Sequence, residues 1–465
     1  MSVFAPELER LRHVQSVGVV GRVAAVRGLT LLVDDLTVPV GSLVRIGQPR
    51  DTGAAMGEVV GSAGGQTAVM LLGQTFGIRA RDPVTLIQTE RAARVGERLL
   101  GRVIDGLGRP IDGGPPTHCR HTRALDPEPI AAMRRRRIDT QLLTGVRAVD
   151  LMTPVGRGQR LGIFAGPGVG KSTLLGQMAR STDADVSVIA LIGERGREVR
   201  DFVEHALGEE GLAKSVVIAA TGDESPPMRL RAAKLACAAA EHFRDAGRDV
   251  LLVMDSVTRL CHAQRQIGLS VGEPPATRGY TPSVFSEMAL LLERAGTVDT
   301  QSGAGSITGM YTILVEGDDA TEPISDAARG ILDGHLMLSR KLAQKGHFPA
   351  IDVLDSVSRV ADDVTDARHR GGRTQLARVL AAYREVEDLV QIGAYASGSD
   401  PDSDVAIEFH KPIEALLAQG RGEASRFEEA REMMIKLGLQ TSEAAESLAV
   451  QRAAATRGVG QRKGA

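Results

Sequence analysis

The chain has 465 residues, and its 56 Lys and Arg residues nearly balance its 58 Asp and Glu residues, for a formal net charge of −2. It contains no Trp, and aromatic residues make up only 3%. Such a chain lacks the basic field and the stacking rings that nucleic-acid binding normally uses, so we expect no nucleic-acid partner. The three isolated cysteines, Cys119, Cys237 and Cys261, have no metal-ligand spacing and fit buried thiols in a reducing cytosol.

Residues 1–14 repeat apolar side chains at helical spacing, which predicts a short amphipathic helix that either packs on the protein or docks on a partner. From 15 to 95, short Val- and Leu-rich runs broken by Gly, Asp and Pro predict a small β-barrel. A connector over 96–143 follows and includes the four arginines Arg134–Arg137. Because no aromatic residue interleaves with these arginines, we interpret them as a solvated linker rather than a nucleic-acid patch.

The region 96–372, which begins with that connector, alternates apolar β-type runs with helical stretches. The runs "RLGIFA", "VSVIALIG", "SVVIAA" and "DVLLVMD" each stand next to a helical pattern. This rhythm predicts βαβ units around a mostly parallel sheet, and therefore an α/β domain.

Residues 373–440 carry an apolar stripe at helical spacing and predict a helical domain. Ser425 and Glu428 predict a capping box ahead of one helix, which Gly438 is placed to end. The tail over 441–465 is rich in Ala, Ser, Gln and Arg without a clear apolar face, so we expect partial disorder there.

A glycine-rich stretch lies between a buried-strand pattern and a helix start, the setting that a phosphate-binding loop requires. Its backbone N–H groups and the helix N-terminus are predicted to hold the phosphates of a nucleotide. Lys171 would contact the β- and γ-phosphates, and the Ser172 hydroxyl would ligate Mg²⁺. Ala165 stands where the loop usually begins with glycine, and it can serve there if its φ is negative. The predicted nucleotide-binding residues are Gly166, Pro167, Gly168, Val169, Gly170, Lys171, Ser172 and Thr173.

Four more side chains are candidates for the chemistry. Asp255 ends an apolar run, at the edge where α/β sheets bind ligands, and is predicted to hold the Mg²⁺ shell. Glu194 follows another strand end, where it would polarise the attacking water. Arg195 would orient Glu194, or it forms a simple ion pair at a helix start. Arg359 is either a surface residue or a charge-stabilising finger that completes a neighbour's site.

Longer strings resemble one family. Residues 254–296, "MDSVTRLCHAQRQIGLSVGEPPATRGYTPSVFSEMALLLERAG", closely resemble the ATPases that energise flagellar and virulence type III protein export, as do residues 305–360. Residues 144–166 are similar as well. The resemblance implies an α/β fold with a RecA-like P-loop NTPase core, an N-terminal β-barrel and a C-terminal helical domain, assembled as a homohexameric ring.

The same resemblance implies functional roles for single residues. Lys171 and Ser172 match the phosphate and Mg²⁺ residues, and Glu194 matches the catalytic glutamate. Arg359 matches the arginine finger, and Phe348 falls where the family places an aromatic ring against adenine. The family tolerates alanine at the position of Ala165.

The resemblance also implies a cellular setting. Its partners would be a stator-like regulatory protein, a stalk protein, the export gate, export substrates and their chaperones. No signal peptide or membrane span is evident in the sequence, so we expect a cytoplasmic protein that associates with the inner face of the membrane through these partners.

Several functions stay open at this point. Flagellar export is the leading hypothesis, and the virulence injectisome version shares its chemistry. A catalytic subunit of a rotary ATP synthase is disfavoured by the export-like stretch 254–296. An RNA motor of the transcription-terminator kind is disfavoured by the near-neutral charge and the scarce aromatics. A nucleotide-binding module without turnover is disfavoured by Glu194.

Overall fold

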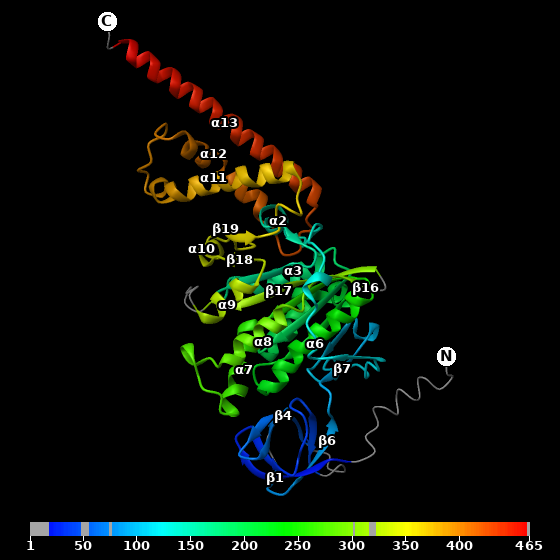
Figure 1. Cartoon of the computed structure of the whole chain (residues 1–465). Helices are drawn as coiled ribbons and strands as arrows, with labels where there is room; N and C mark the ends of the chain where they lie inside the picture. The colour runs from blue at the N-terminus through cyan, green and yellow to red at the C-terminus, as the bar shows by residue number, and fades with distance from the viewer. Residues whose placement is uncertain (1–17, 48–54, 74–76, 301–302, 316–321, 463–465) are drawn as a thin grey trace.

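The computed structural model describes residues 18–47, 55–73, 77–300, 303–315 and 322–462, so the helix predicted over 1–14 lies outside the described residues. Figure 1 shows three parts in chain order: a barrel at the bottom, a sheet flanked by helices in the middle, and a group of helices at the top. Among the described residues, no helix combines the length and apolar character that crossing a bilayer requires.

Six of the described strands close the N-terminal barrel, each antiparallel to its neighbours. Side chains alternate along a strand, so every second residue points inward and the inward residues, such as Val23, Val44 and Val69, fill the barrel. Just past the barrel, Arg91 donates to the buried Glu58 at 3.1 Å and to Asp126 at 3.1 Å, which ties the barrel to the next domain. In barrel order the strands are β1 (Val20–Arg27), β2 (Thr30–Asp34), β5 (Gln66–Leu71), β4 (Ala55–Ala63), β3 (Leu43–Ile46) and β6 (Pro83–Gln88).

In the described part of the chain, nine strands form the central sheet. Most neighbours are parallel, but the edge strand β19 runs antiparallel to β18, and β16 pairs antiparallel with β17. The parallel strands therefore all end at one edge of the sheet, whereas β19 ends at the other. In sheet order the strands are β19 (Ile351–Ser358), β18 (Gly334–Leu338), β12 (Arg160–Ala165), β17 (Gly303–Leu314), β15 (Asp249–Asp255), β13 (Val186–Ile192), β14 (Ser215–Ala220) and β8 (Arg102–Ile104), with β16 (Gly296–Thr300) beside β17.

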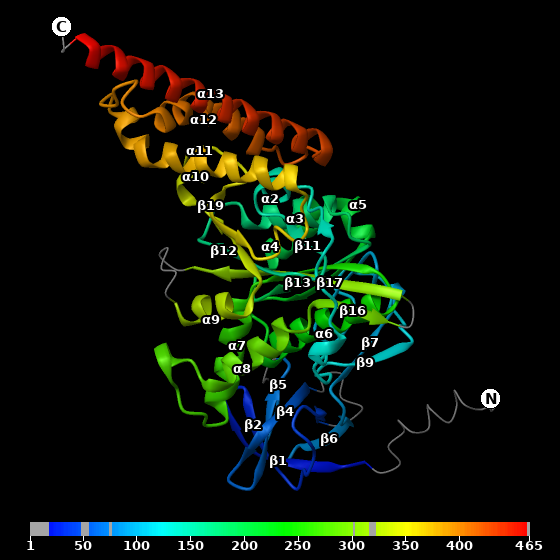
Figure 2. The ribbon, with the colours of Figure 1, turned by 45° about the horizontal axis from the view of Figure 1, so that its top comes forward.

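Helices cover both faces of this sheet (Figure 2). Alternate residues of β13 belong to different cores: Val188 and Ala190 pack with one set of helices, and Ile189 and Leu191 with the other. Burial on both faces explains why these strands read as continuous apolar runs. On the first face lie α6 (Pro226–Asp245), α7 (Val257–Ser270), α8 (Pro282–Leu292) and α9 (Pro323–Ile331), with the short η4 (Thr277–Gly279) in the connection from α7 to α8; on the second lie α2 (Arg147–Met152), α3 (Lys171–Ser181), α4 (Gly196–Asp201), the π-helix η3 (Phe202–Leu207) and α5 (Gly208–Ala213).

The connector is anchored through Arg135, which is only partly exposed, whereas Arg134, Arg136 and Arg137 are exposed and fit the interpretation of a solvated linker. Arg135 donates to the carbonyl of Glu293, the C-cap residue of α8, at 2.5 Å, where helix carbonyls lack partners of their own, and to the carbonyl of Ala295 at 2.8 Å. Arg136 pairs with an aspartate at 3.5 Å and Arg137 with another at 2.6 Å. The connector elements are β7 (Ala92–Val95), η1 (Glu97–Leu99), β9 (His121–Ala124), η2 (Ala132–Arg134), β10 (Gln141–Leu142) and β11 (Val155–Gly156).

Three long helices form the C-terminal part: α11 (Ala367–Gln391), α12 (Pro401–Leu417) and α13 (Phe427–Arg462), after the short α10 (Arg340–Gln344). Two local predictions fail here. The capping box is wrong, because the buried Ser425 hydroxyl has no hydrogen-bond partner among the described residues and α13 begins two residues later. Gly438 does not end the helix; a Cβ there would lie 3.2 Å from the Gly372 Cα, so the glycine lets α13 approach α11 closely. The predicted tail continues α13 as helix up to Arg462.

Candidate active site

The glycine-rich loop connects the end of β12 to the start of α3, as the sequence predicts. Gly168 and Gly170 have φ values of 78° and 91°, a conformation that favours glycine. Ala165 is the last residue of β12 and pairs with Leu314 and Leu338 on the two neighbouring strands. Among the described residues, the non-glycine residues with positive φ are Asp35, Arg81, His118 and Arg278, so Ala165 meets the condition set for it.

The side chains of Lys171, Asp255 and Glu194 come together at the carboxyl edge of the sheet. The Lys171 ammonium donates to Asp255 Oδ1 and lies 3.4 Å from Glu194 Oε1. Asp255 is nearly fully buried, and Thr312 Oγ1 on the adjacent strand donates to the same carboxylate oxygen at 2.7 Å. Two carboxylates and one cation therefore share a small volume directly behind the loop, and a triphosphate would enter the reach of all three.

Electrostatics within this cluster are strongly coupled. Burial alone lowers the pKa of the Lys171 ammonium, but the charges of Asp255 and Glu194 outweigh burial and raise it above its ordinary value. Burial raises the pKa of the Glu194 carboxyl; Lys171 opposes this and Asp255 reinforces it. Glu194 is therefore a stronger base than a free carboxylate, which suits a group that activates water.

A cavity of about 450 Å³ adjoins the loop. Phe348 stands on its wall with 46% of its surface exposed, so it is not an ordinary core residue. A Cβ on Gly170 would lie 3.6 Å from the Phe348 ring, which places the ring against the phosphate-binding loop. Val169, Gly170 and Thr173 line the same cavity. An exposed ring beside a phosphate loop offers a stacking face for a nucleobase.

The far wall of the cavity, residues 418–423, escaped the sequence analysis. Gln419 fixes this wall: its side chain accepts from Arg147 N at 2.9 Å and donates to Gly145 O at 2.9 Å and to Glu423 O at 2.8 Å. Its backbone N–H donates to Phe348 O at 2.8 Å. The bonds to Arg147 and Gly145 join residues more than 270 positions apart, which no local pattern could signal.

One polar side chain that lines the cavity was not predicted from the sequence. Gln177, on α3 one and a half turns past the loop, lines the cavity with only 4% of its surface exposed. Its side-chain nitrogen is buried and has no hydrogen-bond partner within the described part of the chain.

Two arginines, Arg195 and Arg259, lie near this edge of the sheet but make different contacts from those of Lys171. Arg195 lies 74% exposed and donates to Glu198 at 2.9 Å, so the structure brings it into the helix-start ion pair rather than into the cluster. Arg259, which the sequence analysis missed, lies in the first turn of α7, four residues after Asp255, and packs on Gly193, where a Cβ would lie 2.8 Å from the Arg259 Cβ. Because Gly193 directly precedes Glu194, Arg259 adds a cation to the carboxyl edge of the sheet.

Arg359 lies at the opposite edge of the sheet from the carboxyl edge, where the parallel strands begin. Its backbone N–H donates to Asp333 O at 3.0 Å, and the Asp333 N–H donates to Arg160 O at 2.8 Å, so Arg359 is level with the start of β12. The phosphate-binding loop follows the other end of β12, five residues on, a distance of about 17 Å along an extended strand. The exposed Arg359 is thus displaced from the cluster in its own chain by the length of β12.

Comparisons with known proteins identify the family of the chain. Residues 145–358 match the model of the ATP synthase alpha/beta family, nucleotide-binding domain, and residues 365–436 match the T3SS EscN ATPase C-terminal domain. A flagellum-specific ATP synthase of Treponema pallidum (strain Nichols) is 51% identical over 419 residues, which cover 90% of this chain and 93% of the relative. The chain belongs to the family of flagellum-specific ATP synthases and type 3 secretion system ATPases.

Other members of this family are also similar. A type 3 secretion system ATPase of Xanthomonas euvesicatoria is 46% identical over 414 residues, with 89% of this chain and 93% of the relative covered. Among solved structures, the assembled ATPase EscN in complex with its central stalk EscO, from the enteropathogenic E. coli type III secretion system, superposes with a TM-score of 0.82. That structure is 39% identical and covers 90% of this chain and 100% of the solved chain.

The residues present fit a magnesium ion that arrives with a nucleotide. Ser172 presents a hydroxyl from the exposed first turn of α3, and Asp255 presents a carboxylate held by Thr312. Mg²⁺ prefers such hard oxygen ligands and commonly takes only one or two from protein, with phosphates and water completing its shell.

Proposed function

We propose that the chain hydrolyses Mg-ATP to ADP and phosphate, and that this turnover energises flagellar type III protein export. The observation that carries the proposal is the cluster in which Lys171 lies between Asp255 and Glu194, directly behind a phosphate-binding loop. The names of the relatives supply the process, because flagellum-specific ATP synthase is the name of the Treponema relative at 51% identity.

Each residue then has a chemical task. The loop amides of Gly166–Gly170 and the Lys171 ammonium hold the β- and γ-phosphates. Ser172 and Asp255 would hold Mg²⁺, which supplies charge neutralisation on the phosphates when bound. Glu194 orients the attacking water and accepts its proton, and its raised pKa suits that step. Phe348 stacks on the adenine in the adjoining cavity.

We infer further that the site is completed by a neighbouring copy. Arg359 lies at the edge of the sheet opposite Lys171, so its guanidinium serves the γ-phosphate held by the next chain. An arginine finger of this kind is worth about 10³–10⁵ in turnover. A homohexameric ring gives every interface both halves of the site, and the assembled state of the related EscN supports such a ring.

The partners follow from the same assignment. The EscN structure contains a central stalk, and we propose that this chain also takes a stalk protein through its ring. A stator-like regulatory protein, the export gate, substrates and chaperones would place the ring in the cytoplasm at the inner face of the membrane. A virulence system is the second candidate, favoured by the 46% identical Xanthomonas relative. Loss of motility in a deletion strain would support the flagellar role.

Two variants test the shared site. Arg359→Ala should abolish turnover while it spares nucleotide binding, because Arg359 is absent from its own chain's pocket. Glu194→Gln should also abolish turnover. A mixture of the two chains should recover phosphate release at hybrid interfaces that combine an intact Glu194 with an intact Arg359. If light scattering confirms mixed rings and no activity returns, the shared site is refuted.

A further inference from the structure

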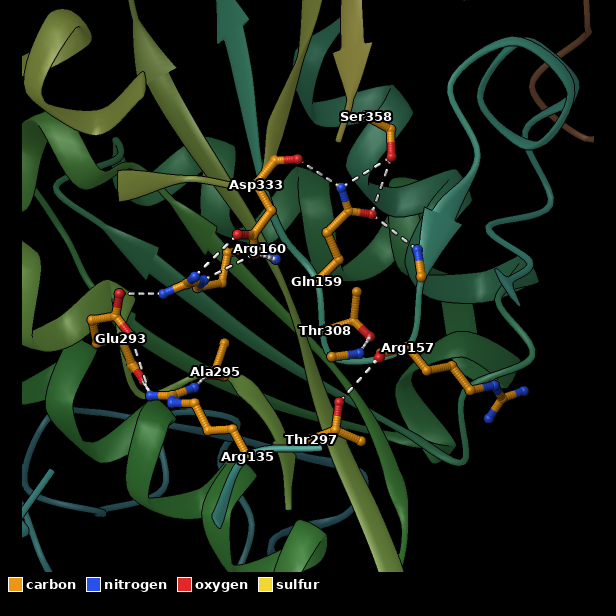
Figure 3. A network of polar contacts seen from close by, with 12 residues as sticks. Arg135, Arg157, Gln159, Arg160, Glu293, Ala295, Thr297, Thr308, Asp333 and Ser358 are labelled. Carbon is orange, nitrogen blue, oxygen red and sulfur yellow. Dashed lines mark hydrogen bonds and ion pairs between the residues drawn. The ribbon is translucent and has the colours of Figure 1, made fainter. Parts of the chain in front are cut away.

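A dense polar network lies at the edge of the sheet that carries Arg359 (Figure 3). Arg160, the first residue of β12, and Asp333, the residue before β18, hold each other on both backbone and side chain. The Asp333 carboxylate accepts from Arg160 N at 3.1 Å, from Nε at 3.0 Å and from Nη2 at 3.0 Å, and Asp333 N donates to Arg160 O at 2.8 Å. Side-chain exposures of 18% and 24% leave little room for this pair to reorient.

The backbone of Arg359 is attached to this pair. The Asp333 carbonyl accepts from Arg359 N at 3.0 Å and from Gln159 Nε2 at 3.0 Å. Gln159 is fully buried and also donates to Ser358 Oγ at 3.0 Å, the residue just before Arg359. The finger therefore starts from a point that Gln159 and Arg160, the residue before β12 and its first residue, fix through Asp333.

The strand that provides this support is rigid and runs to the nucleotide. β12 is hydrogen-bonded on both sides, to β17 and to β18, and ends at Ala165 next to the phosphate-binding loop. Gly334 lets the last residues of β19 come close to β18, because a Cβ there would lie 2.2 Å from Val357 O. One strand thus carries the chain's own phosphate loop at one end and the support of Arg359 at the other.

We propose that Asp333 is a positioning residue for Arg359: by locking onto Arg160 it fixes the carbonyl that holds the Arg359 backbone, and so sets how the finger reaches the nucleotide of the neighbouring copy. Because Arg160 belongs to β12, one strand carries both the support of this finger and the phosphate loop of the same chain. This inference rests on the proposed function, since it requires a neighbour's nucleotide for Arg359 to reach.

Asp333→Asn tests the proposal. The substitution keeps the volume and the backbone carbonyl but removes the charge that holds Arg160, so the finger is misplaced rather than deleted. A misplacement near 1 Å costs about 10²-fold in rate, and we expect kcat to fall by up to that factor while the Kd for Mg-ATP stays unchanged. Arg160→Lys should behave alike, because a lysine cannot donate the same pair of side-chain bonds. It provides a second test if Asp333→Asn folds poorly.

Mixed rings separate a finger defect from a general structural defect. The Asp333→Asn chain should regain activity when mixed with the Glu194→Gln chain, which brings an intact finger, and should gain nothing from the Arg359→Ala chain. Glu293→Gln is the matched control, because Glu293 bonds Arg160 and Arg135 in the same network but neither Asp333 nor Arg359, and it should keep kcat.

Two results would overturn the inference: a wild-type kcat in Asp333→Asn, or recovery with Arg359→Ala in place of Glu194→Gln. Failure of Glu194→Gln and Arg359→Ala to complement each other would instead refute the proposed shared site, and the inference would fall with it. The two failures are therefore distinguishable in one set of mixtures.

Discussion

The two edges of the central sheet differ in how their charged groups are arranged. At the carboxyl edge, Lys171, Asp255 and Glu194 converge and are largely buried, and the two carboxylates share one cation. At the opposite edge, Arg160 and Asp333 are locked together, and Arg359 extends beyond them exposed. The first edge is built to receive charge on a ligand, and the second to present a cation outward.

The difference shows why one chain is insufficient for the proposed reaction. The phosphate-binding loop and the support of Arg359 are attached to opposite ends of β12, about 17 Å apart by strand geometry. The side chains at the carboxyl edge depend on one another for stability, whereas Arg359 depends on its support only for position. Substitutions at the two edges should therefore separate stability from turnover.

Lys171→Ala should have the largest effect. We expect turnover to fall by about 10³-fold or more, since a cation on the reacting phosphates is lost. The substitution also leaves Asp255 and Glu194 unneutralised in a buried site, which costs about 3 kcal/mol of the free energy of unfolding. Arg359→Ala should stop turnover without that cost. Equal thermal melting curves for the two variants would contradict the contrast between the edges.

Gly334→Ala should have the next largest effect, at the edge that carries Arg359. Its φ of +151° and the 2.2 Å approach of Val357 O leave no room for a Cβ, so β18 and β19 must separate. We expect a loss of about 3 kcal/mol in the free energy of unfolding, measured by urea titration. Gly330→Ala is the control: it lies in α9, no atom of the described residues outside its own stretch of helix lies within 4 Å of its Cβ position, and it should stabilise by about 0.5 kcal/mol. A loss of equal size in both would reject the steric argument.

The sequence predicts the carboxyl edge well, for a physical reason. Parallel strands end at the same edge, so residues that follow two strand ends must lie near one another, as Asp255 and Glu194 do. The strand–loop–helix pattern placed Lys171 beside them. The buried free thiols of Cys119, Cys237 and Cys261 were likewise predictable from their spacing.

Contacts between distant segments were not predictable. Gln419 fixes the far wall of the cavity beside Phe348 by hydrogen bonds to Gly145 and Arg147, and Arg135 caps the end of α8. No sequence pattern near either residue indicates its partner. Local rules also misled where tertiary packing used the same residue type. Glycine often ends a helix, but Gly438 lies inside α13, where the absence of a Cβ allows close contact with Gly372.

A pH effect should test the segment that holds the cavity wall beside the carboxyl edge. Burial raises the pKa of Asp150 to about 7, although its carboxylate accepts from Thr144 and Gly145 in the loop that holds Gln419. The folded state then binds more protons than the unfolded state between about pH 4 and pH 7, so this group makes the free energy of unfolding fall as pH rises through that window. Asp150→Asn should remove that slope.

The measurement is the difference between wild type and Asp150→Asn in urea unfolding at pH 5.5 and pH 8. Asp112→Asn serves as the control, because hydrogen bonds from Arg102 lower the pKa of Asp112 and its contribution is constant above pH 5. A difference that is the same at both pH values for Asp150→Asn would show that Asp150 stays charged throughout.

Phe348→Ala should have the smallest effect, and it should weaken nucleotide binding without changing the rate of the chemical step. Stacking on a base is worth about 1–3 kcal/mol and tolerates any base, so KM for ATP and for GTP should rise together by about 10-fold. Because the base makes the same contact in the ground and transition states, kcat should hold, and Phe348→Tyr should restore KM. The ring is half exposed, so melting curves should not move. If kcat fell while KM held, Phe348 would act on the reacting phosphates, and the division of the carboxyl edge into a phosphate part and a base part would be wrong.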